Sequence, residues 1–319
     1  MWVMEAESLP SLCPSEHSDH TRHLRVALVQ TRWHDSIEEH RDVLADGIET
    51  AARCGAEIVF LPELTMMRYL ADCRPPRADR SGLAESLDHG DSSIFFKIMS
   101  AGNKIFVNGS IFEKIGDDAQ RGFNSSVLFS PEGDIAQVTR KMHIPVSAGY
   151  YEDEYFEQGP AEPDGGSYPV VSLPIPGEPR LGMPTCWDEW FPETARMYAL
   201  QGAELLSYPT AIGSEPDFPD FDTEPLWEAA IRGNAIANGL FMIVPNRYGN
   251  EGKITFYGSS FIADPFGRIL VQAPRDSDAV LIANLDLGQR EDWLELFPFF
   301  KTRRPESYDI IADKNLGIN

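Results

Sequence analysis

Cys186 follows an apolar segment in the run LGMPTCWDEWFPE (residues 181–193), where a strand is expected to end and a helix to begin. A side chain on such a turn projects from the sheet edge, and the next backbone N–H groups point at the group it attacks. This placement suits a nucleophilic thiol that has an oxyanion partner. The alternative is an ordinary buried cysteine, because a free cysteine most often packs as a small apolar side chain.

A thiol nucleophile needs a base and a partner for the oxyanion that forms. Histidine is the usual base, and of the seven histidines only His143 lies near an expected strand end. Glu63 is the alternative base, because it follows the apolar segment 57–61 at the carboxyl edge of the expected sheet. Lys141 ends another expected strand as a fixed cation. A glutamate or lysine alone is more often a solvated surface group. Because Glu63, Lys141 and Cys186 all lie at strand ends, a catalytic role for the three together is favoured.

The segments that would position these residues alternate between strands and helices. Strands are predicted at residues 24–30, 57–61, 104–112, 124–130, 135–141, 203–208, 240–245, 257–263, 269–272 and 279–285. Helices are predicted at residues 36–54, 92–101, 191–201 and 224–238. Ser36 and Glu39 form a possible capping box for the first helix, and the Pro- and Gly-rich region 160–179 is loop or sheet edge. Strand–helix alternation in both halves predicts an α/β fold of two sheets with outer helices, a four-layer αββα sandwich in a single domain.

Composition narrows the function classes. The 319 residues carry a net charge of −23, from 27 basic and 50 acidic residues, which argues against a nucleic-acid partner. The acidity favours solubility or salt adaptation, and it also suits cationic small molecules. There is no apolar run of about 18 residues, so no membrane span or membrane partner is expected. The four cysteines lack the paired spacing of a zinc or redox site, which predicts a cytoplasmic protein without a metal.

Residues 1–23 are expected to be a poorly structured extension. They carry several acidic residues and lack the basic start and apolar core of a secretory signal. A main domain is predicted at 24–308, followed by a tail at 309–319.

Three segments resemble the catalytic signatures of the nitrilase superfamily of carbon–nitrogen hydrolases. They are LPEL at 61–64, RKMHIP at 140–145 and TCWDEWFPE at 185–193. The runs YPTAIGSEP at 208–216 and ITFYGSSFIADP at 254–265 add to the resemblance. Within the superfamily the chain most resembles the N-carbamoylputrescine amidases. The resemblance implies the αββα sandwich, a homodimer or higher homo-oligomer, and a site without metal or cofactor.

The resemblance also implies a role for each signature residue. Glu63 is implied as the general base and later the acid, Lys141 as the cation that stabilises the oxyanion, and Cys186 as the nucleophile. The backbone N–H of Trp187 would complete the oxyanion site. A fourth family pattern, glycine, tyrosine, any residue, glutamate, ends here in Glu152, which would orient the lysine.

Candidate substrate-binding residues surround these signatures. They are Trp187, Asp188, Glu189, Tyr208, Pro209, Thr210 and Glu154. A cationic substrate tail would need a carboxylate, and Glu215 is a further candidate. Asp188 has an alternative role as a helix cap, where negative charge is favourable, and the aromatic residues have an alternative role in the core. The family usually has two acidic residues and a proline where this chain has VSA at 146–148, on a loop expected to border the substrate.

The leading hypothesis is hydrolysis of an N-carbamoyl amine, similar to N-carbamoylputrescine, to the amine, carbon dioxide and ammonia through a thioester-type intermediate. The substrate would be a small ureido or amide compound. An alternative is an N-carbamoyl-β-alanine or general aliphatic amide hydrolase, and an anionic substrate would need an arginine or lysine in the pocket. An alternative of another class is a non-catalytic binding protein that keeps the fold.

Overall fold

A computed structural model describes residues 1–74, 82–116, 119–162 and 166–313. The strands are β1 Trp2–Glu7, β2 His23–Gln30, β3 Ile58–Phe60, β4 Phe106–Glu113, β5 Phe123–Phe129, β6 Ile135–Arg140, β7 Val170–Ser172, β8 Arg180–Gly182, β9 Leu205–Ser207, β10 Phe241–Val244, β11 Tyr248–Glu251, β12 Ile254–Tyr257, β13 Phe261–Ala263, β14 Ile269–Gln272 and β15 Ala279–Asp286. The helices are α1 Ile37–Arg53, α2 Asp91–Asn103, α3 Pro192–Leu200, α4 Glu224–Asn238 and α5 Gly288–Leu296. Short 3-10 helices lie at Glu152–Glu154, Cys186–Trp190, Pro305–Ser307 and Asp309–Ala312.

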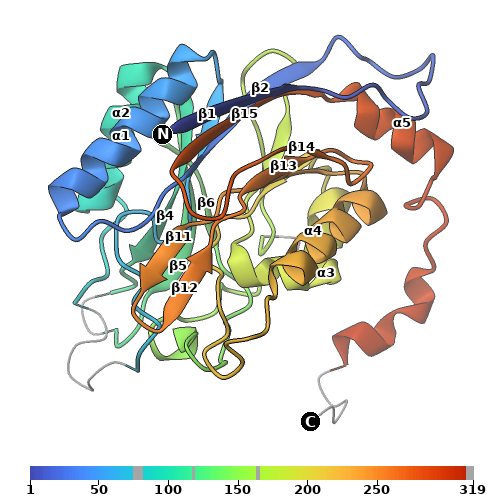
Figure 1. The fold of residues 1–319 in the computed structure, drawn as a ribbon. Coiled ribbons are helices and arrows are strands. Elements are labelled where there is room, and N and C mark those ends of the chain that lie inside the picture. Colours follow the sequence, from blue (N-terminus) through green and yellow to red (C-terminus); the bar gives the residue numbers. More distant parts are fainter. Residues whose placement is uncertain (75–81, 117–118, 163–165, 314–319) are drawn as a thin grey trace.

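Two mixed sheets face each other, with helices outside both (Figure 1). The first sheet has the order β1-β15-β2-β3-β4-β5-β6, and the second has the order β14-β13-β10-β9-β8-β7. Buried apolar side chains of β2, β3 and β15 meet those of β8, β9, β10 and β13 between the sheets. Helices α1 and α2 cover the outer face of the first sheet, and α3 and α4 cover that of the second. The predicted four-layer αββα sandwich is therefore confirmed.

Local sequence signals account for most of these elements. The side chain of Ser36 caps α1 by accepting from the Glu39 N–H at 3.2 Å, as predicted. The reciprocal bond of a capping box, from the Ser36 N–H to the Glu39 carboxylate, is not found among the described residues, and Ser36 Oγ donates to Glu38 Oε2 at 2.9 Å. The segment predicted as one strand at 257–263 is interrupted at Gly258 and Ser259, which both have positive φ. Its start joins the hairpin β11–β12, which the sequence analysis missed, and its end is β13.

The expectation of a poorly structured N-terminus is wrong for much of residues 1–23. Strand β1 extends the first sheet by pairing in parallel with β15, from Trp2 beside Ala279 to Glu7 beside Asn284. A clasp further along fixes the following segment: His20 Nδ1 lies 2.8 Å from Asp286, and its Nε2 lies 3.3 Å from Asp292. The strand was missed because its partner lies at the other end of the sequence.

The His20 clasp predicts a pH-dependent stability. Its hydrogen bond to Asp286 raises the pKa of His20 above its ordinary value. A raised folded pKa stabilises the fold fully below the unfolded pKa of about 6.5, and this contribution is lost as pH rises through the folded value. We expect His20→Asn to lower the melting temperature more at mildly acidic than at alkaline pH. The matched control is His17→Asn, at an exposed histidine of the same segment; equal pH dependence in both variants would contradict the clasp.

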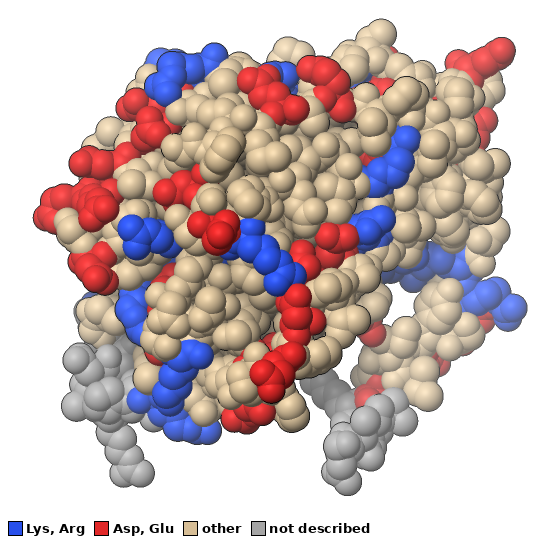
Figure 2. Space-filling view, viewed as in Figure 1, with Lys and Arg blue, Asp and Glu red and all other residues tan. Residues whose placement is uncertain are grey.

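The surface mixes both signs of charge. On the face drawn in Figure 2, basic side chains lie among the more numerous acidic ones. No helix among the described residues is long and apolar enough to cross a membrane. After α5 the chain runs past the side of the molecule that carries α3 and α4 (Figure 1), and the predicted tail begins with the short helix Asp309–Ala312. The rest of that tail, residues 314–319, lies outside the described residues. Self-association stays a prediction.

Candidate active site

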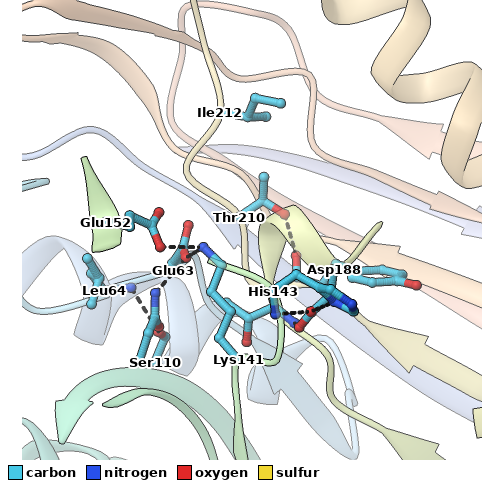
Figure 3. A network of polar contacts seen from close by, with 12 residues as sticks. Glu63, Leu64, Ser110, Lys141, His143, Glu152, Asp188, Thr210 and Ile212 are labelled. Carbon is cyan, nitrogen blue, oxygen red and sulfur yellow. Dashed lines mark hydrogen bonds and ion pairs between the residues drawn. The ribbon is translucent and has the colours of Figure 1, made fainter. Parts of the chain in front are cut away.

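Three of the four predicted catalytic residues form one buried ion network. Lys141, directly after β6, donates from Nζ to Glu63 Oε1 at 2.8 Å and to Glu152 Oε2 at 2.6 Å (Figure 3). All three side chains are excluded from solvent. Buried charges persist when they are paired and hydrogen-bonded, so this network fixes an ammonium between two carboxyl groups.

Glu63 keeps one carboxylate oxygen free. Its Oε1 accepts from Lys141 and also from Asn124 Nδ2 at 2.7 Å. Its Oε2 is buried and has no hydrogen-bond partner among the described residues. A buried acceptor without a hydrogen bond destabilises the fold. An incoming proton donor would form its hydrogen bond with this oxygen.

The turn that carries Glu63 has an unusual backbone. Leu64, the next residue, has φ +48°, a conformation that side chains disfavour. Ser110 Oγ accepts from the Leu64 N–H at 2.9 Å and donates to Asn124 Oδ1 at 3.2 Å. Strand β4 therefore supports both the strained turn and the amide that orients Glu63 (Figure 3).

Electrostatics distinguish the two ends of the network. Burial opposes the charge of Lys141, but Glu152 and Glu63 outweigh burial and hold the pKa of Lys141 well above its ordinary value. Burial raises the pKa of Glu152 to about 7, against the opposing effect of Lys141. Tyr69 donates from its hydroxyl to Glu152 Oε1 at 2.9 Å. The lysine is thus a permanent cation, and Glu152 is fully engaged in orienting it.

Cys186 comes from the opposite sheet. It lies four residues after β8 and begins the 3-10 helix Cys186–Trp190, which we call the cysteine turn. Its φ is +42°, and its N–H donates to Pro209 O at 3.0 Å. Burial raises the pKa of the Cys186 thiol well above its ordinary value; Glu63 adds to this rise and Lys141 opposes it. This shift favours the protonated thiol, so a nucleophilic role for Cys186 would need a base that takes the proton.

Among the described residues, no backbone acceptor is found for the N–H of Trp187, the second residue of the cysteine turn. The first N–H groups of a helical turn have no partner in a preceding turn. The Cys186 N–H donates to Pro209 O, and the Asp188 N–H donates to Thr185 O at 3.0 Å. The N–H of Trp187 lies between these two along the chain, and its role as an oxyanion donor stays a prediction.

Asp188 has the structural role that was the alternative in the sequence analysis. Its Oδ2 accepts from the Thr185 N–H at 3.1 Å and closes the cysteine turn. Its Oδ1 accepts from the His143 N–H at 3.0 Å and lies 2.7 Å from His143 Nδ1 (Figure 3). The ring of His143 also stacks on Phe191 at 3.7 Å. The contacts between Asp188 and His143 thus connect the segment that carries Lys141 to the segment that carries Cys186. Because both side chains are used in these contacts, Asp188 is disfavoured as a substrate ligand and His143 as the base.

The other predicted substrate-binding residues divide by burial. Tyr208, Pro209, Thr210 and Glu189 are buried, as Glu63, Lys141 and Cys186 are, so their contact with a substrate stays a prediction. Trp187 is half-buried. Glu154 is paired with Arg74 at 2.7 Å.

Sequence reasoning missed Tyr69 and Asn124, which complete the network. Neither stands in a recognised signature, and each acts through one hydrogen bond to a carboxylate. Asn124 starts a segment predicted as a strand, and a buried amide on that strand was the available signal. Among the described residues no cluster of histidine, cysteine or acidic side chains is arranged to hold a metal.

The fold and this site define a class of protein. Residues 25–295 match the family model for carbon-nitrogen hydrolases. The chain therefore belongs to the carbon–nitrogen hydrolase family of the nitrilase superfamily.

Named relatives span nearly the whole chain. A citrullinase of Francisella tularensis is 37% identical over 91% of this chain and 99% of its own length. An N-carbamoylputrescine amidase of Arabidopsis thaliana is 32% identical over 92% of this chain and 98% of its own. The crystal structure of a carbon-nitrogen hydrolase from Helicobacter pylori is similar with a TM-score of 0.82 and 32% identity, over 92% of this chain and 99% of that one.

Proposed function

We propose that the protein hydrolyses a terminal ureido group on a small amine, with Cys186 as the nucleophile. The observation that carries the proposal is the buried network in which Lys141 is fixed between two carboxyl groups while Glu63 Oε2 stays free. The free oxygen is an acceptor for a proton of the thiol, of water or of the substrate.

The reaction follows from these groups. Cys186 Sγ bonds to the ureido carbonyl carbon as Glu63 takes the thiol proton. The oxyanion is stabilised by the Lys141 ammonium and the Trp187 N–H. Glu63 returns the proton to the departing nitrogen, which leaves a thioester-type intermediate. Water, deprotonated by Glu63, attacks the intermediate, and the proton on Glu63 returns to the sulfur, so the thiol is restored and a carbamic acid is released. The carbamic acid decomposes to carbon dioxide and its nitrogen compound, so the products are the amine, carbon dioxide and ammonia.

Glu215 supports a substrate with a cationic tail. Its carboxyl group is half-buried, and burial raises its pKa. No hydrogen bond or ion pair of this side chain is found among the described residues. Tyr150 connects it to the site, because both Glu215 and Cys186 raise the pKa of Tyr150 after the larger effect of burial. A partly desolvated carboxylate without an ion pair among the described residues suits an ammonium group of the substrate.

The loop around Glu215 is built against the segment that carries Glu152. Gly149 has φ +81°, and an added Cβ there would lie 2.5 Å from Pro216 Cγ. The Tyr150 hydroxyl accepts from the Gly213 N–H at 3.0 Å. These contacts fix the loop at residues 213–216 beside the network.

Citrulline and N-carbamoylputrescine, the compounds in the relatives' names, share this chemistry. Each has a terminal ureido group on a short carbon chain that carries an amine. Citrulline also has a carboxylate, which needs a cation, whereas the charged group that we propose for the substrate tail is the carboxylate of Glu215. We therefore favour N-carbamoylputrescine or a similar N-carbamoyl amine as the substrate.

A substrate panel with ammonia release as the readout tests the proposal. We expect N-carbamoylputrescine to have a higher kcat/KM than citrulline, N-carbamoyl-β-alanine or a simple aliphatic amide. Faster turnover of citrulline or N-carbamoyl-β-alanine would contradict the cationic tail, and labelling of Cys186 without turnover of any compound would favour the non-catalytic alternative.

The variant Glu215→Gln tests whether Glu215 binds the ammonium group of the substrate tail. We expect kcat/KM for N-carbamoylputrescine to fall roughly 10–100-fold, mainly through KM, because a hydrogen bond to a charged group is lost. The neutral analogue N-butylurea should be unaffected. The control variant is Asp217→Asn, at an exposed residue two positions further along the same loop. An equal loss with both substrates would show that Glu215 does not bind the ammonium.

A further inference from the structure

Glu189 is a buried carboxyl group that the reaction above does not use. It lies on the cysteine turn, three residues after the thiol, and it is fully excluded from solvent. Its Oε1 accepts from Trp227 Nε1 at 2.6 Å, and its Oε2 lies 3.4 Å from Thr210 Oγ1. Its backbone carbonyl accepts from Asn234 Nδ2 at 2.9 Å. No ion pair of Glu189 is found in the part of the chain that the structure describes.

Counting protons identifies the donor in the contact between Glu189 and Thr210. A threonine hydroxyl carries a single proton. Thr210 Oγ1 lies 2.7 Å from Tyr208 O, and a carbonyl oxygen can only accept. The hydroxyl proton is therefore used in that shorter bond. For the longer contact to be a hydrogen bond, the proton must come from Glu189 Oε2.

The charges around Glu189 favour the same state. Burial is the main cause that raises the pKa of Glu189 well above its ordinary value. The bond from Trp227 opposes this shift, and nearby Glu63 adds to it. The titratable groups that face Glu189 are Glu63, Lys141, Cys186, Tyr208 and Tyr257. Lys141 is already shared by two other carboxyl groups, so an ionised Glu189 would be a buried anion without a cation of its own.

The segment that Glu189 contacts touches both reacting groups. Pro209 O accepts from the Cys186 N–H at 3.0 Å, and Thr210 O accepts from the Glu63 N–H at 3.4 Å. The segment 208–210 therefore bonds to the backbone of both the nucleophile, from one sheet, and the base, from the other. A bond from Glu189 to Thr210 ties that segment back to the cysteine turn.

We propose that Glu189 is a positioning residue that acts as a neutral acid, donating from Oε2 to Thr210 Oγ1 and accepting from Trp227. It fixes the position of the segment 208–210, whose backbone bonds to Cys186 and Glu63, without placing a further negative charge beside the thiol. The inference rests on the proposed function only in taking Cys186 as the nucleophile. The protonation state of Glu189 is independent of the substrate.

Glu189→Gln and Glu189→Leu together test the proposal. Glutamine keeps the shape, one acceptor and a donor toward Thr210, so we expect kcat/KM to stay within about threefold of wild type with an unchanged pH profile. Leucine removes both bonds, so kcat should fall roughly 10–100-fold while KM changes little. A glutamine variant that folds as wild type but is as slow as the leucine variant would overturn the proposal.

Two readouts need no turnover. The infrared difference spectrum between wild type and Glu189→Gln at neutral pH should contain the band of a protonated carboxyl group; loss of a carboxylate band instead would overturn the proposal. The pH dependence of Cys186 alkylation by iodoacetamide should coincide in the two proteins. If Glu189 were an anion, its replacement would shift alkylation to lower pH. These results stand even if the substrate panel fails, so the two proposals can fail separately.

Discussion

Cys186→Ala is expected to lower kcat/KM on every ureide and amide substrate by on the order of 10⁴-fold or more, because the covalent route disappears with the nucleophile. Cys186→Ser should be nearly as inactive, since a hydroxyl is harder to deprotonate than a thiol and the base here is a single carboxylate. The measurement is steady-state ammonia release, together with mass spectrometry of the protein after mixing with substrate. Wild type should show a transient adduct, and both variants should show none.

The control for this prediction is Cys73→Ser, at an exposed thiol. It should keep wild-type activity. All four cysteines are free, so an alkylating reagent can label several of them, and protection by substrate should be confined to Cys186. Substantial turnover by Cys186→Ala would mean that water is activated without a covalent intermediate.

Lys141→Met should abolish activity and destabilise the fold at the same time. Losing an oxyanion partner costs roughly 10²–10³ in kcat, and leaving buried carboxyl groups without their cation costs about 3–5 kcal/mol. Burial already raises the pKa of Glu152 to about 7 with the lysine present, and removal of the lysine raises it further. A raised carboxyl pKa destabilises the fold above the unfolded value of about 4.3, so the deficit should shrink as pH falls toward that value.

Urea unfolding of wild type and Lys141→Met across this pH range measures the deficit. The double variant Lys141→Met/Glu152→Gln is the matched comparison, because it removes one of the two orphaned carboxyl groups. It should recover part of the stability at neutral pH while staying inactive. A single variant as stable as wild type at neutral pH would show that the network is not charged as described.

The sequence predicted the layers and most elements because their signals are local. Alternating apolar residues and the cap at Ser36 each act within a few positions. Strand β1 was not predicted, since its pairing with β15 joins residues more than 270 positions apart. Helix α5 was missed for a related reason: it is short and polar, and the N-terminal segment packs beside it through contacts such as Ser15 N–H to Asp292.

For the site, the signatures led to Glu63, Lys141, Glu152 and Cys186, and the structure joins the first three by hydrogen bonds. Proximity to a signature in sequence does not say which way a side chain points, so it is a weaker guide to the residues that surround these four. Asp188 and Glu189 flank the thiol in sequence, yet one closes the turn and the other is buried against Trp227. Tyr69 supports Glu152 from a distant segment.

Because the site is divided between two sheets, the distance between its base and its nucleophile depends on how those sheets are placed relative to each other. Glu63 and Lys141 follow strands of the first sheet, and Cys186 follows a strand of the second. The layer between them is apolar and includes Leu28 and Phe60 opposite Leu205 and Ile243. Volume changes in such a layer are transmitted as small displacements of whole sheets. Substitutions deep in this layer can therefore alter the reach between base and nucleophile, so selection on catalysis also acts on packing far from the substrate.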